Sequence, residues 1–285
     1  MSRFDTLFSR LREEGAFVPF LMLGDPSPED SLEIVRALVA AGADALELGV
    51  PFSDPVADGP TIQAAHVRAL AGGASLEGSL AQIRAIREEF PRLPLGMLVY
   101  GNVPFARGLD AFYREFAEAG ADAILLPDVP VREGGPFIEA AERAGIDPVF
   151  IAPPQAAEAV LESVAVHSRG YIYAVSRDGV TGTEKQSRTV GLKEAVEHVA
   201  RFGGAPILLG FGISRPEHVR AAMQAGAAGA ITGSAITKIV EGHCVPDESR
   251  PSRSEHGVPA SRVGDRAALR AELEEYVREM KQATL

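Results

Sequence analysis

Short apolar runs alternate with amphipathic helical patterns along most of the chain. Four times an apolar helical run ends in Ala-Gly, a short polar step follows, and a β-rich apolar run begins; these copies start at Ala41, Ala119, Ala144 and Ala225. In each copy the Gly stands where a helix often ends on a left-handed residue. Four more short apolar runs, bounded by Gly, Pro or Asp, predict strands over 17–23, 95–100, 170–175 and 206–210.

Eight strand candidates that alternate with helices predict a parallel sheet with right-handed crossovers. Eight such units close most readily into a TIM-type (β/α)8 barrel, so we expect the α/β class and a single barrel domain over 1–285. An open doubly wound sheet is the alternative, and the absence of GxGxxG at the first βα turn counts against it. Active sites of such barrels form from the loops that follow the carboxyl ends of the strands.

Three segments lie outside this repeat. Residues 2–14 predict an extra N-terminal helix that covers the barrel floor. Extra helices are expected near the C-terminus, and the last, over 266–282, has Leu269, Leu273 and Tyr276 on one stripe. The segment 245–265 contains three prolines and no apolar periodicity, which predicts a flexible surface insertion.

A carboxylate interrupts the apolar strand over 44–49. Two-residue alternation turns Leu46 and Leu48 to one face of this strand and Glu47 to the other. Both faces of a parallel sheet are covered, and a buried, unpaired carboxylate is costly. Asp58 follows in the next loop. We therefore interpret Glu47 and Asp58 as catalytic; the alternative is a Glu47 paired with an arginine or with backbone amides.

The loops after the seventh and eighth strands carry few side chains. Gly212 lies in the first of these loops, and Gly233 and Ser234 begin a helix after the second. Glycines let backbone N–H groups approach a dianion, and a helix start adds free donors. Because barrels often bind phosphate between these two loops, we expect a phosphate site there. Glycines that merely relieve tight turns are the alternative.

A long polar run after the sixth strand predicts a lid. It contains Arg177, Gly179 and Thr181, and it exceeds a usual βα connection. Closure of this lid would exclude water from an acid–base reaction; a loop without that function is the alternative. Apolar side chains at or just beyond the strand ends predict a pocket for a flat aromatic group: Phe20, Leu98, Leu125, Ile151, Tyr173 and Phe211.

Composition excludes several classes of protein. The 285 residues are 46% hydrophobic and 24% charged, and 28 Lys plus Arg against 39 Asp plus Glu give a net charge of 28 − 39 = −11. This charge disfavours binding to nucleic acid and to anionic membranes. No apolar segment reaches the roughly 20 residues of a spanning helix. A single cysteine, Cys244, fits a reducing compartment, so we expect a cytoplasmic protein.

The sequence also offers no candidate residues for a Schiff-base lysine or for a catalytic metal site. A Schiff-base mechanism needs a lysine at a strand end, and the lysines lie elsewhere, at Lys185, Lys193, Lys238 and Lys281. No metal is expected, because the histidines lack ligand spacing. They are interpreted as surface residues: His66, His167, His198, His218, His243 and His256. Acid–base chemistry by Glu47 and Asp58 remains.

One motif resembles a known family. Leu46-Glu-Leu-Gly-Val-Pro-Phe-Ser-Asp-Pro-Val-Ala-Asp-Gly-Pro is similar to the signature of tryptophan synthase alpha subunits, and the resemblance runs from Phe17 to Lys238. It implies cleavage of indole-3-glycerol phosphate to indole and glyceraldehyde 3-phosphate. It also implies that the chain itself carries no cofactor and has a beta-subunit partner containing pyridoxal phosphate, in an α2β2 heterotetramer. A sugar-phosphate isomerase or epimerase and a non-catalytic activator subunit are the alternatives.

The resemblance also implies residue roles. Glu47 protonates indole C3 and accepts the glycerol hydroxyl proton, and the ionised Asp58 holds the indole N–H. Apolar surroundings are expected to raise the pKa of Glu47 and keep it protonated near neutral pH. Met22 departs from the family pattern, where a small polar residue is common. The remaining implied roles are phosphate binding by Gly182, Gly212, Gly233 and Ser234, and partner contact by Asp54, Pro55, Asn102 and Pro130.

Overall fold

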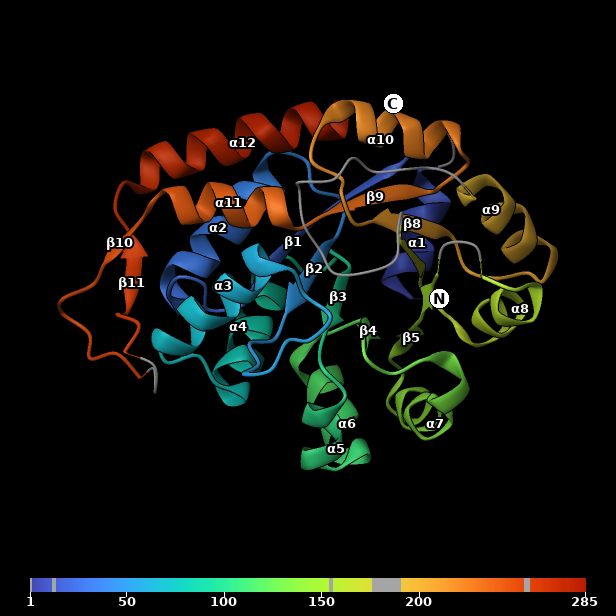
Figure 1. The fold of residues 1–285 in the computed structure, drawn as a ribbon, viewed down its shortest axis with the longest axis horizontal. Helices are drawn as coiled ribbons and strands as arrows, with labels where there is room; N and C mark the ends of the chain where they lie inside the picture. The colour runs from blue at the N-terminus through green and yellow to red at the C-terminus, as the bar shows by residue number, and fades with distance from the viewer. Residues whose placement is uncertain (1, 12–13, 154–155, 176–190, 254–256) are drawn as a thin grey trace.

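The computed structural model describes residues 2–11, 14–153, 156–175, 191–253 and 257–285. Its main sheet is parallel and runs in the order β5-β4-β3-β2-β1-β9-β8-β7-β6 (Figure 1). The strands are β1 (Ala16–Met22), β2 (Leu46–Gly49), β3 (Leu95–Leu98), β4 (Ala123–Leu125), β5 (Asp147–Val149), β6 (Ile151–Ala152), β7 (Ile172–Val175), β8 (Ile207–Gly210) and β9 (Gly229–Thr232).

The two ends of this sheet are consecutive in the chain. β5 and β6 are separated only by Phe150, whose carbonyl accepts a hydrogen bond of 3.1 Å from the N–H of Tyr173 on β7. These two short strands are therefore one strand position that bends where the ring closes. Eight strand positions form a barrel, which confirms the predicted fold class and excludes the open doubly wound sheet.

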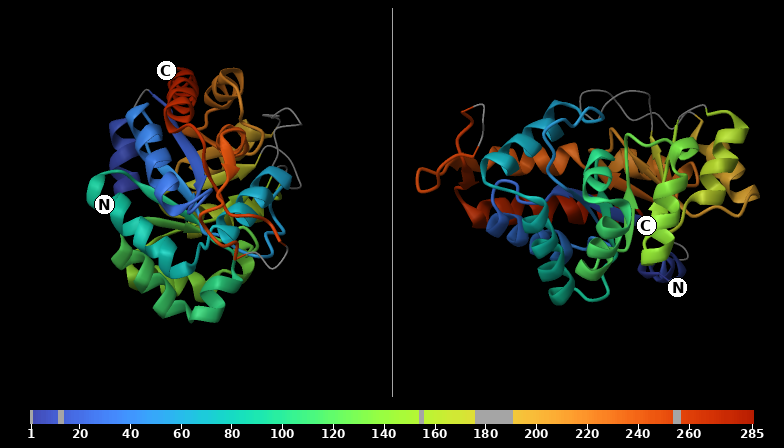
Figure 2. Two further views of the ribbon diagram at one scale, coloured as in Figure 1. Left: turned by 90° about the vertical axis from the view of Figure 1, so that its left-hand side faces the viewer. Right: turned by 90° about the horizontal axis from the view of Figure 1, so that it is seen from below.

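Side-chain alternation separates two apolar layers. Along β1, Val18, Phe20 and Met22 belong to the barrel interior, whereas Phe17 and Leu21 pack outward against the helices. Figures 1 and 2 show the helices on the outside of the sheet. They are α2 (Pro28–Ala40), α3 (Pro60–Ala71), α4 (Leu76–Glu89), α5 (Asn102–Arg107), α6 (Leu109–Ala119), η1 (Val131–Glu133), α7 (Gly135–Ala144), α8 (Glu158–His167), α9 (Leu192–Arg201), α10 (Pro216–Gln224), α11 (Ser234–Gly242) and α12 (Arg266–Gln282).

The Ala-Gly repeat ends four of these helices as predicted. Its glycines, Gly42, Gly120, Gly145 and Gly226, all have positive φ, between 72° and 106°. An L-residue with a side chain is strained in this conformation, so glycine stops the helix at a defined point. Each strand then begins a few residues later.

Helix α1 (Arg3–Arg10) covers the barrel floor, as expected. Ser2 and Asp5 form a capping box at its start. Phe4 is fully buried in the interior cluster, and its ring centroid lies 5.0 Å from that of Tyr171, just before β7. This end of the barrel is therefore filled by side chains, which leaves the carboxyl ends of the strands as the open end.

The predicted insertion over 245–265 is flanked by two short strands. β10 (Cys244–Pro246) and β11 (Ser261–Val263) form an antiparallel pair that extends past the barrel helices (Figure 1). The N–H of Val263 donates to Asp30, and that of Arg253 donates to the carbonyl of Ala71. Short strands therefore stand at both ends of the predicted insertion, and residues 254–256 lie outside the described part.

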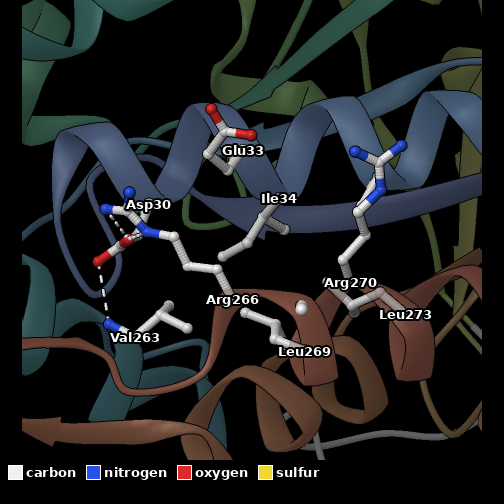
Figure 3. A pocket seen from close by; sticks show the side chains of 10 residues that line it. Asp30, Glu33, Ile34, Val263, Arg266, Leu269, Arg270 and Leu273 are labelled. Carbon is white, nitrogen blue, oxygen red and sulfur yellow. Dashed lines mark hydrogen bonds and ion pairs between the residues drawn. The ribbon is translucent and has the colours of Figure 1, made fainter.

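Helix α12 closes the molecule and packs along α2. Arg266 donates to buried Asp30 from Nε at 2.8 Å, and Leu269 and Leu273 lie beneath a hollow of about 210 Å³ between the two helices (Figure 3). The hollow is lined by residues of α2 and α12 and by Val263. In the described ranges no helix is long and apolar enough to cross a bilayer.

Candidate active site

Glu47 lies inside the barrel. β2 is flanked by β1 and β3, and Glu47 is in register with Phe20 and Gly96. Its side chain is 1% exposed, and its Oε1 accepts a hydrogen bond of 2.9 Å from the hydroxyl of Tyr171. No basic side chain of the described ranges forms an ion pair with it, so the arginine-paired alternative does not hold there.

Burial gives Glu47 an unusual acidity. The pKa of its carboxyl is raised to about 8, chiefly by desolvation; the Tyr171 hydrogen bond lowers this pKa, and the charge of Asp58 raises it. The side chain is therefore protonated at neutral pH, as expected from its apolar position. The influence of Asp58 shows that the two carboxyls share one poorly hydrated interior.

Glycines make room for the tyrosines that reach this interior. A methyl group built on Gly96 would lie 2.8 Å from the Tyr171 hydroxyl, and one built on Gly210 would overlap the ring of Tyr173. Sequence reasoning missed Tyr171, although two-residue alternation places it on the same face as Tyr173. Its hydroxyl bonds to a residue 124 positions away, a pairing that no local pattern reveals.

Asp58 is held by a different set of partners. It is 4% exposed, and its Oδ2 accepts from the Tyr100 hydroxyl at 2.7 Å and lies 3.2 Å from Nε2 of His66. The Tyr100 hydroxyl accepts in turn from the N–H of Ala57, and Gln63 Nε2 donates to the carbonyl of Asp58. The two acidic groups thus differ in their hydrogen-bond partners: among the described residues, Glu47 has a single hydroxyl, and Asp58 has a phenol and an imidazole.

The prediction of a surface position for His66 is wrong. The side chain is 1% exposed, and Nδ1 accepts a hydrogen bond of 2.9 Å from the N–H of Phe52. Ile62, His66 and Ala69 follow an i, i+4, i+7 spacing on α3, and Ile62 and Ala69 belong to the interior cluster. That spacing was the available signal. His167 is exposed, whereas His198, His218 and His243 are half-buried, and His256 lies outside the described residues.

The predicted pocket residues gather in one cluster. Phe20, Leu125 and Tyr173 are buried in the barrel interior, with Leu98, Ile151 and Phe211 partly buried against them. Burial raises the pKa of the Tyr173 hydroxyl, and the charges of both Glu47 and Asp58 raise it further. Tyr173 therefore lies within electrostatic reach of both carboxyls. Met22 is also in this cluster, beside Gly49.

The two predicted phosphate loops have different backbones. Phe211 and Gly212 have φ of 60° and 73°, so two successive residues adopt the left-handed region, a strained conformation for Phe211. Gly233 precedes Ser234, the first residue of α11, with an ordinary φ of −109°. Gly212 therefore needs its glycine for backbone conformation, whereas Gly233 does not.

The predicted lid falls outside the described residues. Arg177, Gly179, Thr181 and Gly182 belong to 176–190, which the structure does not describe.

The predicted partner residues lie in the segments that follow the carboxyl ends of the strands. Asp54, Asn102 and Pro130 are exposed and Pro55 is half-buried. They follow β2, β3 and β4, and the N–H of Gly101 donates to Asp128 at 2.8 Å, which joins two of these loops. Sequence reasoning missed two apolar neighbours, Val56 and Phe105, which are 73% and 77% exposed.

A parallel barrel with a protonated carboxyl and a hydrogen-bonded carboxylate in one apolar interior defines an acid–base enzyme of the α/β-barrel class. A family model described as tryptophan synthase alpha chain matches residues 8–284. The chain belongs to the tryptophan synthase alpha chain family, whose lyase reaction cleaves indole-3-glycerol phosphate to indole and glyceraldehyde 3-phosphate. Membership of this family does not support the alternatives of a sugar-phosphate isomerase or epimerase and of a non-catalytic activator subunit.

Characterised relatives agree with this assignment. The chain is 71% identical to the tryptophan synthase alpha chain of Corynebacterium aurimucosum over 88% of its length and 92% of that protein. It is 63% identical to that of Corynebacterium efficiens, over 100% and 99% of the two chains.

Solved structures agree as well. A tryptophan synthase structure from Mycobacterium tuberculosis superposes with a TM-score of 0.81 at 29% identity, covering 99% of this chain and 98% of that one. A tryptophan synthase complex from Pyrococcus furiosus gives a TM-score of 0.76 at 30% identity, covering 94% and 98%.

Proposed function

We propose that Glu47 is the acid and base of the retro-aldol cleavage and that Asp58 binds the indole N–H. The protonated carboxyl of Glu47 donates its proton to indole C3, which leaves a cationic ring. The bond from C3 to the glycerol carbon then breaks and restores the aromatic ring. Glu47 takes the proton of the hydroxyl on that carbon, so the carboxyl ends the cycle protonated and the aldehyde leaves as glyceraldehyde 3-phosphate.

The observation that carries this proposal is the contrast between the two carboxyls. A donor to C3 must hold its proton at neutral pH, and the Glu47 pKa of about 8 meets this requirement. A negative charge opposite the ring nitrogen stabilises the cation, and Asp58 is the carboxylate that accepts hydrogen bonds. The apolar cluster around Tyr173 supplies surfaces for the flat ring.

The phosphate of the substrate is proposed to bind at Gly182, Gly212, Gly233 and Ser234. Support comes from the start of α11 at Ser234, where free N–H groups and the helix dipole favour an anion. The left-handed backbone at Gly212 makes a tight turn, and a glycine there lets a ligand approach the chain closely. With a net charge of −11, backbone donors bind the phosphate without a basic patch. Arg177, Gly179 and Thr181 are proposed to belong to a lid over this site.

We also propose a beta-subunit partner in an α2β2 heterotetramer, with pyridoxal phosphate held by that partner and the complex in the cytoplasm. The Pyrococcus furiosus neighbour is described as a tryptophan synthase complex, which supports a beta partner. Asp54, Pro55, Asn102 and Pro130, with Val56 and Phe105, are the proposed contact residues. Exposed apolar side chains beside polar ones are typical of an interface.

The test measures indole released from indole-3-glycerol phosphate, with and without a beta subunit. Glu47→Gln keeps the shape and removes the proton donor, so we expect turnover to fall about 100-fold or more, with binding of glycerol 3-phosphate unchanged. Glu139→Gln, at an exposed position of α7, is the matched control. Turnover by Glu47→Gln at the level of that control would contradict the proposal.

A further inference from the structure

We infer that His66 is a positioning residue that aims Asp58 at the indole N–H and fixes both ends of the loop between β2 and α3. This inference rests on the role proposed above for Asp58. It assigns to His66 no contact with the substrate.

The ring of His66 joins two points of one loop. Its Nδ1 accepts from the N–H of Phe52, near the start of the loop, and its Nε2 lies 3.2 Å from Oδ2 of Asp58, near the end. Because a backbone N–H can only donate, Nδ1 must be the unprotonated nitrogen. The proton of the neutral ring is therefore on Nε2 and points at Asp58. The tautomer follows from the backbone contact.

The arrangement leaves one oxygen of Asp58 for a ligand. His66 and Tyr100 both donate to Oδ2, at 3.2 and 2.7 Å. In the described part of the chain no hydrogen bond reaches Oδ1. Two donors on one oxygen fix the rotation of the carboxylate, so Oδ1 is the oxygen that would accept the indole N–H. Fixed orientation of this kind lowers the reorganisation needed in the reaction.

Packing alone does not account for the imidazole. His66 shares its side of α3 with Ile62 and Ala69, both in the barrel interior, and a buried polar ring is costly unless its nitrogens are bonded. In the described ranges both bonds go to the loop that carries Asp58. The Tyr100 ring, edge-on at 6.2 Å, and Phe52, stacked on Tyr100 at 5.2 Å, complete this cluster.

Two substitutions separate the two hydrogen bonds. In His66→Asn the amide oxygen occupies the place of Nδ1, so the bond from Phe52 is kept and the bond to Asp58 is lost. In His66→Gln the amide nitrogen occupies the place of Nε2, so the bond to Asp58 is kept and the bond from Phe52 is lost. Both variants bury an uncharged amide, which makes each the control for the other.

The experiment compares kcat and KM for indole release, together with binding of glycerol 3-phosphate, which has no ring. Loss of a hydrogen bond to a charged group changes an equilibrium by about 10- to 100-fold. We expect His66→Asn to lower kcat in this range, His66→Gln to restore most of the loss, and both to bind glycerol 3-phosphate as the parent does. Parental turnover of His66→Asn, or equal loss in both variants, would overturn the inference.

Asp58→Asn separates this inference from the proposed function. If Asp58→Asn turns over at the parental rate, the role of Asp58 is wrong. If Asp58→Asn is inactive while His66→Asn is fully active, the role of Asp58 stands and only the inference about His66 fails.

Discussion

Two carboxyl groups acquire different chemistry from their immediate neighbours. Among the described residues, the buried Glu47 has one hydroxyl partner, whereas Asp58 has a phenol and an imidazole directed at one oxygen. Burial also raises the pKa values of Tyr171 and Tyr100, and a carboxyl beside each raises them further. Both phenols therefore remain hydrogen-bond donors across the physiological range.

Removal of the Tyr171 hydroxyl should move the pH profile. This hydrogen bond lowers the pKa of Glu47, so in Tyr171→Phe the pKa rises above about 8. Glu47 must be protonated to act, and activity is lost as the pH rises through its pKa. The basic limb of the kcat profile is therefore expected at higher pH in Tyr171→Phe than in the parent. Tyr113→Phe, on α6, is the matched control, and an unmoved or downward-shifted limb would contradict this account.

The buried carboxyl of Glu47 should also lower the free energy of unfolding at neutral pH. The pKa of Glu47 in the folded protein, about 8, lies above its ordinary value of 4.5. The contribution of this carboxyl to the free energy of unfolding is therefore fully present below pH 4.5 and is lost as the pH rises toward 8. We expect Glu47→Gln to raise the free energy of unfolding at pH 7 by up to about 3 kcal/mol relative to the parent, and this gain to shrink toward pH 5. Urea titrations at both pH values measure this, with Glu139→Gln as control. A gain independent of pH would refute the assignment.

The sequence predicted the buried position of Glu47 and the cluster of apolar pocket residues. It did not predict the side chains that form hydrogen bonds with the two carboxyls. Two-residue alternation is a local property and predicted that Glu47 faces the interior, and position at a strand end predicted the same for Tyr173; both lie there. The partners of Asp58 depend on how the loop folds back, and Tyr100 lies 42 residues from it. Local signals existed for His66, in its helical spacing with Ile62 and Ala69, and for the face on which Tyr171 lies, in its alternation with Tyr173.

At the scale of elements, the strands determine which side chains can meet. Gly96 is in register with Glu47 on the neighbouring strand, and its missing side chain is the space that the Tyr171 hydroxyl occupies. β3 thus contributes to the site because Gly96 has no side chain and leaves room for Tyr171. The same relation holds between Gly210 of β8 and Tyr173 of β7.

Gly96→Ala should therefore impair both stability and catalysis. Its methyl group would lie 2.8 Å from the Tyr171 hydroxyl, so the tyrosine must move away from Glu47. We expect a loss of about 1–3 kcal/mol in the free energy of unfolding and a fall in kcat. Gly135→Ala, where nothing lies within 4 Å, is the control and should be neutral. Unchanged kcat and stability in Gly96→Ala would show that the site adapts.

Element positions were predictable where the pattern is local. The expected closing helix over 266–282 matches α12 (Arg266–Gln282), because an apolar stripe and the Asp265 cap specify it. The β10–β11 pair was missed because neither of its short strands has an apolar pattern that predicts a strand. The hydrogen bond from the N–H of Val263 to Asp30 spans 233 positions, so no local pattern indicates it.

For the whole molecule, the closed barrel assigns the two ends different roles. The floor is filled by α1 and the interior cluster, and the proposed substrate and partner sites both lie at the end that carries Asp54, Asn102 and Pro130. The net charge of the chain disfavours polyanionic partners but does not locate a protein partner. Val56 and Phe105 become visible as interface candidates only when their exposure is known.

Phe105 provides the test at this scale. The side chain is 77% exposed, so Phe105→Ser should leave the free energy of unfolding within about 0.5 kcal/mol of the parent. Buried aromatic anchors carry much of the binding energy of interfaces, so we expect the affinity for a beta subunit to fall about 10-fold or more. Val166→Ser, at a 49% exposed position on α8, is the control and should bind normally. A titration of the beta subunit that finds equal affinity for both variants would remove this surface from the interface.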